Sequence, residues 1–505
     1  MVALALHPRD VGMLLIGYSE GAVIYSFKQN KALKFFNYQL PSGAPGGELD
    51  PAAIRYARSP KLTHAVWHPT GTFILACYED ASIVIWDPRD GRLVMARTLE
   101  DTRVDKPTNG PQPVGLAGQA GLRRDPVRQV AWCAGQDPDD TSILIAGAGS
   151  SDLPTKGISY WELGRTPNYA TSSWDILYKY FESPKRQRIF PTPPGIEVVD
   201  FCLIPRASPH FAGAQEPMCL LGLLGSGEIA TLSFPNGSPV TAAQHIHPSL
   251  MLVHPFVTHA DMAGVERMRW LGMHEKRQRH PPIAQGGSGA IRSKGRSDVR
   301  NILLTSHADG TVRVLDVGHG DEIENKSVLQ IDVGRVLGRF HDLIVNHLSI
   351  ASATGELAVG MQSGEVLVFR WGLNKSPGQE PPPLQPELGN LINITGQKEP
   401  DLVEGLMPFT FLKMRTSVTA LKISDVGFMA AGFEEGMLAV LDLRGPAMIY
   451  QTTMAECSRH SKRSSFRRSS HQQAPRAEWP VCLEFSVSGH LMPFWSINAR
   501  KLTFV

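Results

Sequence analysis

Residues 61–96 read KLTHAVWHPTGTFILACYEDASIVIWDPRDGRLVMA, and this stretch decides the fold. Apolar runs alternate in it with short segments that contain Pro, Gly and Asp, the residues that favour tight turns. The carboxylate of Asp80 can accept neighbouring backbone N–H groups, and 83–86 is apolar on both faces, as in a buried strand. The pattern predicts short strands with a turn between each pair; they are Leu62–Trp67, Phe73–Cys77, Ile83–Trp86 and Leu93–Ala96.

The same unit recurs along the chain. Four short strands, with Trp86-Asp87 at the end of the third, are typical of one blade of a WD-repeat β-propeller. The other copies lie at 2–38, 127–163, 198–234, 301–316, 348–371 and 418–443. These make about seven blades, with part of an eighth where 481–486 begins a strand and 489–505 does not continue as a blade. The predicted fold class is all-β, built from WD-repeat-like β-propellers with long loop insertions.

Chain length and the spacing of the strands favour two propeller bodies. At 505 residues the chain is too long for one ordinary core. The strand pattern breaks after 235–238, which places a boundary near residue 240. We predict that 1–240 holds the later blades of a first propeller and that 241–505 holds the early blades of a second. Three polar segments without apolar periodicity are predicted to be disordered loops, namely 274–300, 376–398 and 451–478.

Composition limits the classes of function. The formal net charge is +2 and the basic residues cluster in loops, so we predict no nucleic-acid partner. The aromatic and basic segment 174–188 leaves a single-stranded nucleic-acid surface as a minor alternative to aromatic side chains that cover a propeller edge. The six cysteines form no CxxC pair, which indicates reduced thiols in a cytosolic protein. No apolar run reaches the ~20 residues of a membrane helix, so the protein is predicted to be soluble or peripheral to a membrane.

The sequence contains no catalytic motif. GxxxxGK[ST], GxSxG, HExxH and the kinase motifs are all missing. The glycine-rich segment 222–227 has no following helix that could bind phosphate, so a blade turn is predicted there. His245 and His247 could share one face of a strand, but without a third ligand nearby we expect a solvated connection. We therefore predict that the protein is not an enzyme and has no cofactor and no metal site.

Short motifs spread along nearly the whole chain carry a further signal; they are Pro8–Gly12, Leu40–Gly47, Met95–Thr98, Ile204–Gly213, Gly355–Gly360 and Leu443–Tyr450. In type and order they resemble the lethal giant larvae and tomosyn family, above all its fungal exocytosis members. The resemblance implies paired seven-bladed propellers that bind plasma-membrane SNARE proteins of the syntaxin and SNAP types. In the fungal branch it also implies a Rab GTPase of secretory vesicles as a partner. Family members are longer than this chain, so further blades are implied before and after it.

The resemblance implies a non-enzymatic regulator of vesicle tethering and fusion in polarised exocytosis. The implied location is cytoplasmic and peripheral at the plasma membrane. Two other roles stay open. One is an accessory protein that activates GTP hydrolysis through an arginine finger, although no arginine stands out for this role. The other is a cell-polarity scaffold that acts independently of SNARE proteins.

A polybasic segment, SRHSKRSSFRRSS at 458–470, is the candidate membrane-binding site; its basic and aromatic residues are Arg459, Lys462, Arg463, Phe466, Arg467 and Arg468. It is similar to the polybasic, phosphorylated loop of the animal lethal giant larvae proteins. Each basic residue near an anionic leaflet contributes about 1 kcal/mol, which suffices for reversible recruitment to anionic phospholipids. Phosphorylation of Ser465, Ser469 or Ser470 would cancel this charge and release the protein. A solvated loop is the simpler alternative.

Overall fold

The computed structural model describes residues 2–48, 50–107, 124–149, 157–168, 171–206, 216–240, 256–273, 298–318, 323, 325, 327–382, 389–454, 456, 479–485, 494–498 and 501–504. The chain folds into two compact units. Unit 1 consists of residues 1–206 and 211–241, and unit 2 consists of residues 207–210 and 242–505. No helix among the described residues is long and apolar enough to cross a membrane.

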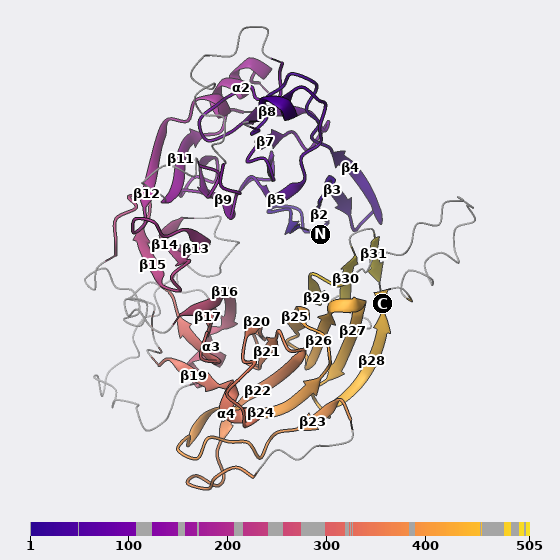
Figure 1. The fold of residues 1–505 in the computed structure, drawn as a ribbon. Coiled ribbons are helices and arrows are strands. Elements are labelled where there is room, and N and C mark those ends of the chain that lie inside the picture. The colour runs from indigo at the N-terminus through magenta and orange to yellow at the C-terminus, as the bar shows by residue number, and fades with distance from the viewer. Residues whose placement is uncertain are drawn as a thin grey trace. The chain divides into compact units, whose positions relative to one another are not determined.

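Unit 1 contains antiparallel sheets in which consecutive strands pair (Figure 1). The first sheet is β1 (Ala3–Leu6), β2 (Met13–Tyr18), β3 (Gly21–Ser26) and β4 (Lys31–Phe36). The second is β5 (Leu62–Trp67), β6 (Ile74–Tyr78), β7 (Ile83–Trp86) and β8 (Leu93–Arg97). The third is β9 (Gln129–Ala134), β10 (Asp140–Ala146), β11 (Gly157–Arg165) and β12 (Arg186–Pro191). The fourth is β13 (Val198–Pro205), β14 (Pro217–Leu224) and β15 (Ile229–Ser233), and the helices are α1 (Pro51–Ile54) and α2 (Trp174–Glu182).

Unit 2 repeats this plan (Figure 1). Its first sheet is β16 (Val257–Glu266), β17 (Val299–His307), β18 (Thr311–Asp316) and β19 (Leu329–Asp332). The second has the order β20 (Val345–Ile350), β21 (Leu357–Met361), β22 (Glu365–Leu373), β24 (Glu404–Lys413) and β23 (Leu391–Asn393). The third is β25 (Val418–Ile423), β26 (Phe428–Phe433), β27 (Met437–Asp442) and β28 (Ala447–Thr453). The last is β29 (Leu483–Phe485), β30 (Phe494–Asn498) and β31 (Lys501–Phe504); the helices are α3 (Arg267–Gly272), α4 (Val333–Leu337) and the 3₁₀ turn η5 (Glu434–Gly436).

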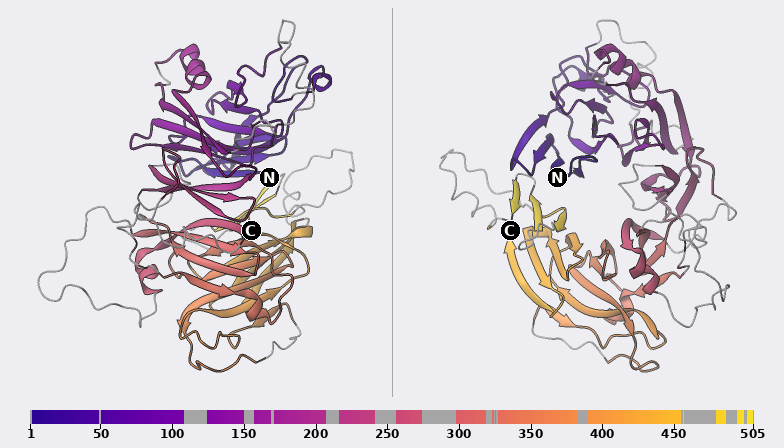
Figure 2. Two further views of the ribbon diagram at one scale, coloured as in Figure 1. Left: turned by 60° about the vertical axis from the view of Figure 1, so that its left-hand side comes forward. Right: turned by 180° about the vertical axis from the view of Figure 1, so that it is seen from behind.

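The core of each unit lies between consecutive sheets. In unit 1, side chains of β5–β8 meet those of β9–β12, and the Phe181 ring of α2 packs edge-on against Phe73 and Trp132 at centroid distances of 5.1 and 6.0 Å. In unit 2, the sheets β20–β24 and β25–β28 lie side by side and share a buried apolar layer (Figure 2). Packing on both faces explains why all four residues of β7 are apolar and buried.

The blade predicted from residues 61–96 is confirmed. β5–β8 form one four-stranded antiparallel sheet with a turn between each pair of strands. Gly71 has φ +77°, a conformation that glycine adopts without steric cost, in the turn before β6. The Asp80 carboxylate accepts the backbone N–H of Ser82 at 3.0 Å, as the sequence predicts. The propeller fold class is likewise confirmed by the recurrence of such sheets in both units.

Parts of the predicted loops are ordered strands. The prediction that the whole of 376–398 is disordered was wrong. It rested on the small number of apolar residues in this segment. It contains β23, where Ile392 is 6% exposed and lies opposite Phe411 of β24. The predicted loop 274–300 likewise ends in the first residues of β17, and the loop 451–478 begins in the last residues of β28. Pairing with a neighbouring strand supplies order that local composition does not show.

Two further differences concern the C-terminal end and unit 1. Residues 489–505 were expected not to continue a blade, yet β30 pairs with β29, and β31 pairs with β30. Helix α2 was not predicted, although Leu177 and Phe181 stand four residues apart and both are 2% exposed.

The boundary between the units falls between residues 241 and 242. That the two units are the later blades of one propeller and the early blades of another stays a prediction.

Candidate functional site

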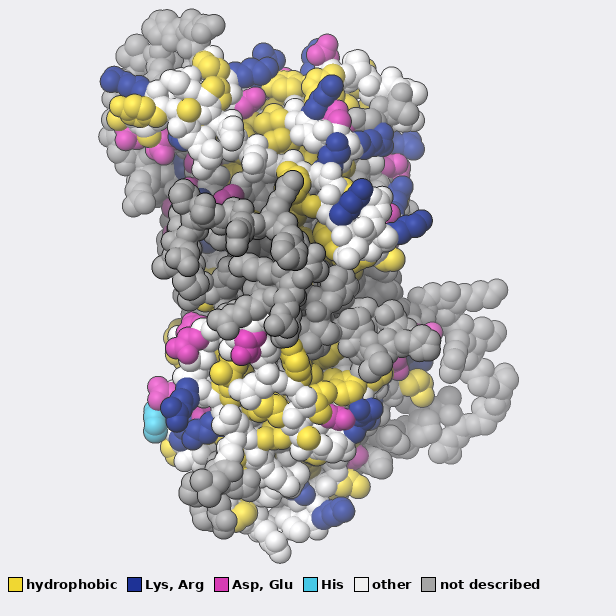
Figure 3. All heavy atoms as spheres, turned by 90° about the vertical axis from the view of Figure 1, so that its right-hand side faces the viewer, with side chains coloured by type: hydrophobic (Ala, Val, Ile, Leu, Met, Phe, Trp, Pro, Cys, Tyr) yellow, Lys and Arg dark blue, Asp and Glu magenta, His cyan; other side chains and the backbone are white. Residues whose placement is uncertain are grey.

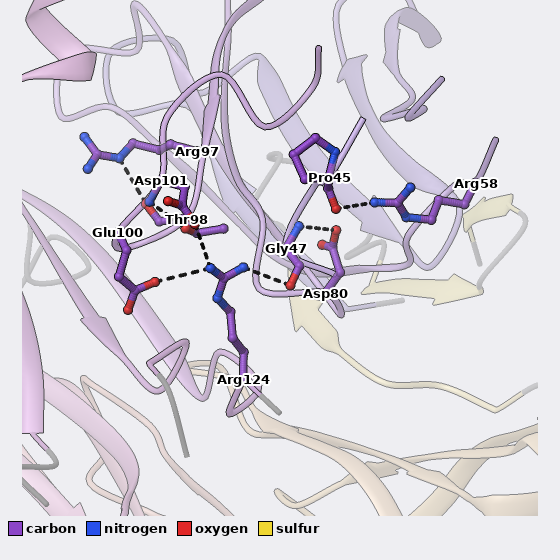
Figure 4. A network of polar contacts seen from close by, with 9 residues as sticks. All are labelled: Pro45, Gly47, Arg58, Asp80, Arg97, Thr98, Glu100, Asp101 and Arg124. Carbon is purple, nitrogen blue, oxygen red and sulfur yellow. Dashed lines mark hydrogen bonds and ion pairs between the residues drawn. The ribbon is translucent and has the colours of Figure 1, made fainter. Parts of the chain in front are cut away.

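The loop that follows β4 carries the Leu40–Gly47 motif, and its two ends are bound together. Leu40 and Arg58 exchange backbone hydrogen bonds of 2.9 and 3.0 Å, and the Arg58 guanidinium donates to the carbonyl of Pro45 (Figure 4). Leu40 and Ala44 are at most 1% exposed and belong to the apolar core shared by the first two sheets, so the loop is anchored in that core. The motif is therefore a fixed part of the surface of unit 1.

Gly46 and Gly47 fasten this loop to the second sheet. The Gly47 N–H donates to the Asp80 carboxylate at 3.0 Å, and the Gly46 N–H donates to the Val104 carbonyl at 2.7 Å. A Cβ on Gly47 would lie 1.5 Å from the Asp80 carbonyl oxygen, a distance that no side chain can tolerate. Glycine is required here because two backbone segments touch.

Arg124 joins the same loop to the segment after β8 (Figure 4). Its Nη1 donates to the Gly47 carbonyl at 2.9 Å, and its Nη2 lies 2.9 Å from Asp101 and 3.6 Å from Glu100. The Arg124 side chain is 10% exposed, so this ion pair is screened less than a surface pair. One guanidinium thus holds two loops that are distant in sequence.

Arg97, in the Met95–Thr98 motif, is the most deeply buried of the three arginines Arg58, Arg97 and Arg124. It is 3% exposed and donates to the carbonyls of Thr98, Phe181 and Glu182 at 3.1, 3.0 and 2.9 Å. Its guanidinium carbon lies 4.2 Å from the centroid of the Trp161 ring, a cation–π contact. The carbonyls of Phe181 and Glu182 belong to the C-terminal end of α2, where the helix dipole favours a cation. Arg97 therefore fixes α2 against β8 and β11.

A groove of about 530 Å³ opens beside these contacts in unit 1. Its walls come from the segments after β8 and β10, from β11 and β12, from the segment before β9, and from the start of β13 and the residue before it; the residues are Leu99, Glu100, Asp125, Arg128, Gly147, Gly149, Gly157, Ser159, Trp161, Gln187, Arg188, Ile189, Glu197 and Val198. Its size is in the range of small-ligand and side-chain pockets. The loops that carry the two motifs and this groove form the candidate functional site, which we call the loop face of unit 1.

The predicted membrane-binding segment is not part of this site. Its basic and aromatic residues, and the candidate phosphorylation sites, all lie outside the described residues; they are Arg459, Lys462, Arg463, Phe466, Arg467, Arg468, Ser465, Ser469 and Ser470. His245, His247 and Cys457 lie outside them too. Within the part of the chain that the structure describes, no cluster of His, Cys, Asp or Glu could hold a metal ion.

The blade turn predicted in the glycine-rich segment 222–227 is confirmed. The turn at 225–227 joins β14 and β15, with φ +80° at Gly227. In another turn, the Nδ1 atom of His7 accepts the N–H groups of Arg9 and Asp10. Burial raises the pKa of the Cys133 and Cys219 thiols to about 12, so both are unreactive at neutral pH.

Charge on the surface of unit 1 is mixed. Figure 3, which shows the right-hand side of Figure 1, has Lys and Arg side chains interspersed with Asp and Glu on the side of unit 1 that faces the viewer. In the segment 174–188, Phe181 is buried in the core, and Lys185 and Arg186 pair with Glu162 at 3.5 and 3.8 Å. This arrangement favours aromatic packing over a stacking surface for nucleic acid.

The sequence did not single out the arginines that organise the loop face. Arg97 stands within one of the family-like motifs, but two of its carbonyl partners lie more than eighty residues away in the chain. Arg58 and Arg124 stand in polar segments without periodicity. The one available signal was the double glycine at 46–47, which indicates close backbone contact when it lies outside a strand.

Comparison with known proteins identifies the family. Residues 342–490 match the family described as "Lethal giant larvae(Lgl) like, C-terminal". The chain is 34% identical over 473 residues to the Saccharomyces cerevisiae lethal(2) giant larvae protein homolog SRO77, a match that covers 91% of this chain and 46% of that protein. It is 25% identical over 468 residues to an uncharacterized Schizosaccharomyces pombe protein, with 90% and 44% coverage. The chain thus spans less than half the length of these curated relatives.

A solved structure supports the fold. The crystal structure of Saccharomyces cerevisiae Sqt1, a WD-repeat propeller, is similar to this chain with a TM-score of 0.50 and 10% sequence identity. The similarity covers 100% of this chain and 94% of that one, and it bears on the fold alone. The motifs at 40–47 and 95–98, which lie on the loop face, resemble the same family that the sequence matches identify. The propeller sheets are the fold expected for that family. This chain belongs to the lethal giant larvae family.

Proposed function

We propose that this chain is a non-enzymatic propeller scaffold that regulates polarised exocytosis. Its proposed partners are plasma-membrane SNARE proteins of the syntaxin and SNAP types and a Rab GTPase of secretory vesicles. The match to the yeast lethal giant larvae homolog along 91% of the chain carries this proposal, because the family acts in exocytosis and cell polarity.

The construction of the loop face supports a role in binding. Its loops are held by buried arginines that donate to backbone carbonyls, as Arg97 and Arg124 do. A loop fixed in this way loses little conformational entropy when a partner binds. Loops on a rigid β scaffold are also the usual place for recognition residues. A scaffold that presents fixed loops is suited to bring two partners together.

We propose that recruitment to the plasma membrane uses the polybasic segment 458–470. Co-sedimentation with vesicles that contain phosphatidylserine or phosphoinositide tests this. The unmodified protein should bind at low salt and more weakly at physiological salt, because the attraction is electrostatic. Arg467→Glu combined with Arg468→Glu, and Ser465→Asp combined with Ser469→Asp and Ser470→Asp, should both reduce binding. Equal binding of all three proteins would reject the proposal.

Binding and hydrolysis assays test the proposed function. The purified chain is immobilised and exposed separately to a syntaxin-type SNARE, a SNAP-type SNARE and the vesicle Rab in its GDP and GTP forms. An unrelated WD-repeat propeller serves as the control. We expect capture of the SNARE proteins and of the Rab, and an unchanged rate of GTP hydrolysis when the chain is added. Faster hydrolysis would favour the GTPase-activating role, and failure to capture either SNARE would favour the SNARE-independent polarity scaffold.

A further inference from the structure

Blades of both units enter their first strand in the same way. The first residue of that strand pairs with the last residue of the second strand, and the register then shifts, as at Leu62 with Tyr78 and at Val345 with Met361. The residue just before the first strand accepts a backbone N–H from the residue just after the second strand, at 2.8 or 2.9 Å. We call this residue the entry residue; the entry residues are Lys61, Glu197, Phe256, Ile344 and Ser417.

Two entry residues of unit 2 are apolar and exposed. Lys61, Glu197 and Ser417 are polar, so the fold does not require an apolar side chain at this position. Phe256 is nevertheless 67% exposed and Ile344 is 55% exposed. Single apolar residues are common on protein surfaces, but a group of them at one end of a sheet indicates a contact surface.

Phe256 and Ile344 stand at the starts of neighbouring strands. β16 and β20 lie side by side in unit 2 (Figure 1). Ser306 of β17 connects their first residues, because its Oγ donates to the Val345 carbonyl at 3.3 Å and lies 3.1 Å from the hydroxyl of Thr258. The two exposed side chains therefore occupy equivalent positions at the same end of adjacent blades.

A third exposed side chain, Phe340, lies in the connection between α4 and β20. It is 91% exposed, although the residues around it are fixed. On one side of it, Arg339 donates to the Glu365 carboxylate at 2.9 Å. On the other side, Leu343 covers the turn between β17 and β18, where a Cβ on Gly310 would lie 2.8 Å from the Leu343 side chain. The same turn donates the N–H that binds the entry residue of β16, so Phe340 belongs to the same end of unit 2.

These three side chains form a patch with acidic neighbours. We call it the entry patch, and it consists of Phe256, Phe340 and Ile344. Asp342 lies in the same connection as Phe340, and Asp309 lies in the turn that Leu343 covers. Both are exposed, and no Lys or Arg among the described residues forms an ion pair with either carboxylate. Arg339 is neutralised by Glu365. On the next blade two acidic and two basic exposed residues offset one another; they are Glu434, Glu435, Lys413 and Arg415.

The area and the charge of the entry patch restrict what can cover it. Its three side chains present on the order of 400 Å² of apolar surface, about half of what each folded protein contributes to a standard interface. A short segment therefore fits the patch better than a second folded copy does. The carboxylates of Asp309 and Asp342 would repel an anionic membrane and attract a basic partner.

We propose that the entry patch binds a short segment of another protein in which apolar residues are flanked by Lys or Arg. The apolar side chains of the segment lie against Phe256, Phe340 and Ile344, and its basic side chains pair with Asp309 and Asp342. Because the connection that carries Phe340 is already fixed, its ordering costs little on binding. This inference does not depend on the identity of the SNARE or Rab partners.

Short peptides test the proposal. The full 505-residue chain is immobilised, and blocked peptides are passed over it up to millimolar concentration, with binding followed by surface plasmon resonance. The probe is Ser-Lys-Leu-Phe-Lys-Ser. One comparison peptide has Glu in place of both Lys residues, and the other has Ala in place of Leu and Phe. We expect the probe to bind about tenfold more tightly than either, because each comparison peptide loses one kind of contact.

Paired variants locate the apolar contact. Phe340→Ser combined with Ile344→Ser should weaken binding of the probe about tenfold. Met268→Ser combined with Leu373→Ser is the matched control, since these side chains are 71% and 58% exposed in the same unit. β22 begins beside the entry patch and ends at Leu373, so the control lies at the other end of the blade. The control should leave binding within about twofold, and thermal unfolding shows whether each variant is folded.

A second pair of variants tests the charge. Asp342 has φ +54°, a conformation that Asn also adopts, so Asp342→Asn keeps the backbone and removes the carboxylate. It should weaken binding of the probe about threefold and leave the Glu peptide no weaker. Asp401→Asn, at another exposed aspartate of unit 2, should leave binding of the probe unchanged.

Three results would overturn the proposal. The first is no binding of the probe by the folded wild-type chain at millimolar concentration. The second is an equal loss of binding in the variants of the entry patch and in their controls, because general surface properties would then be responsible. The third is self-association of the chain, or binding to phosphatidylserine vesicles, that disappears in the Phe340→Ser, Ile344→Ser variant, since another occupant would then cover the patch. Capture of SNARE proteins is measured separately, so the two proposals fail separately.

Discussion

Units 1 and 2 are built from the same kind of sheet and use arginine in the same way, but their loops bury different apolar residues. In unit 1, Arg97 and Arg124 donate to backbone carbonyls of segments that are distant in sequence. In unit 2, Arg370 donates to the Leu443 carbonyl, 73 residues away in the chain, and it also pairs with Glu356. The comparison teaches that long-range arginine contacts are common to both units, so the difference between the units must be sought in their apolar loop residues.

The loops differ in which apolar residues they bury. In unit 1 the loop after β4 places Leu40 and Ala44 in the core shared by the first two sheets, although its Tyr56 is 72% exposed. In unit 2 the connection between α4 and β20 leaves Phe340 91% and Ile344 55% exposed. The side of unit 2 visible in Figure 3 likewise has hydrophobic side chains gathered in its middle, with Lys and Arg at the margins. Leu40 and Ala44 thus contribute to the core of unit 1, whereas Phe340 remains available on the surface of unit 2.

The largest expected effect is at Gly47. Gly47→Val should lower the free energy of unfolding by about 3–5 kcal/mol, because the new side chain collides with the Asp80 carbonyl and the backbone must separate. Gly445→Ala in unit 2 is the control, since a Cβ there meets no described atom within 4 Å. Urea unfolding followed by tryptophan fluorescence measures both. Similar midpoints for the two variants would contradict the packing described for the double glycine.

The next largest effect is at Arg97. Arg97→Leu should cost about 2–3 kcal/mol, because three buried carbonyls lose their donor. Arg97→Lys should recover little of this, since an ammonium cannot reach all three acceptors or stack on Trp161 as a planar group does. Urea unfolding of both variants beside wild type gives the values. Full recovery by lysine would mean that positive charge alone matters at this position.

Lower pH should weaken both units through buried histidines. Burial lowers the pKa of His68 in unit 1 to about 3, and burial together with the nearby His259 lowers that of His347 in unit 2 to about 4. Between these values and about 6.5 the unfolded state binds more protons, so stability falls as the pH falls. From pH 7 to pH 5 the loss should be about 1–2 kcal/mol for each histidine.

A variant isolates the contribution of unit 1. His68→Asn keeps an acceptor for the Thr70 N–H, which the His68 Nδ1 accepts at 3.1 Å, and it removes the titrating group. The loss of stability between pH 7 and pH 5 should be smaller in this variant than in wild type by about 1–2 kcal/mol. Calorimetric unfolding at the two pH values measures it. An unchanged pH dependence would mean that His68 is protonated equally in the folded and unfolded chains.

The smallest effect is at the exposed aromatic residue of unit 2. Phe340→Ser should change the free energy of unfolding by less than about 0.5 kcal/mol, because the ring is 91% exposed and contributes little packing. Urea unfolding under the conditions used for Gly47→Val gives a direct comparison of the loops. A loss of more than about 1 kcal/mol would show that Phe340 packs in solution, and the contrast between the units would then disappear.

The features that the sequence predicted best are those whose interacting residues lie close together in the chain. The turn His68-Pro69-Thr70-Gly71 and the carboxylate of Asp80 lie within a few residues of their partners, so the blade at 61–96 could be predicted. Helix α2 could not, because its aromatic residues resemble strand or surface residues until Phe181 is seen to pack on Trp132. Strand β23 is too short for any periodicity, and only its pairing with β24 defines it.

The candidate site was predicted only in part. The motifs at 40–47 and 95–98 were recognised in the sequence, but the link that Arg124 makes from Gly47 to Glu100 and Asp101 depends on a contact 77 residues apart in the chain. The groove is lined by several separate segments of the chain. No local sequence pattern shows that these segments lie together, so the tertiary fold is needed to reveal the groove.

Hydrogen exchange of the chain, alone and with a saturating amount of a syntaxin-type or SNAP-type SNARE protein, tests most directly that it is a SNARE-binding scaffold. Slow exchange in the β strands of the free chain shows that it is folded. We expect the SNARE to bind and to slow exchange further in surface loops, while the strands remain unchanged. A folded chain whose exchange is the same with and without either SNARE protein would contradict the proposed function.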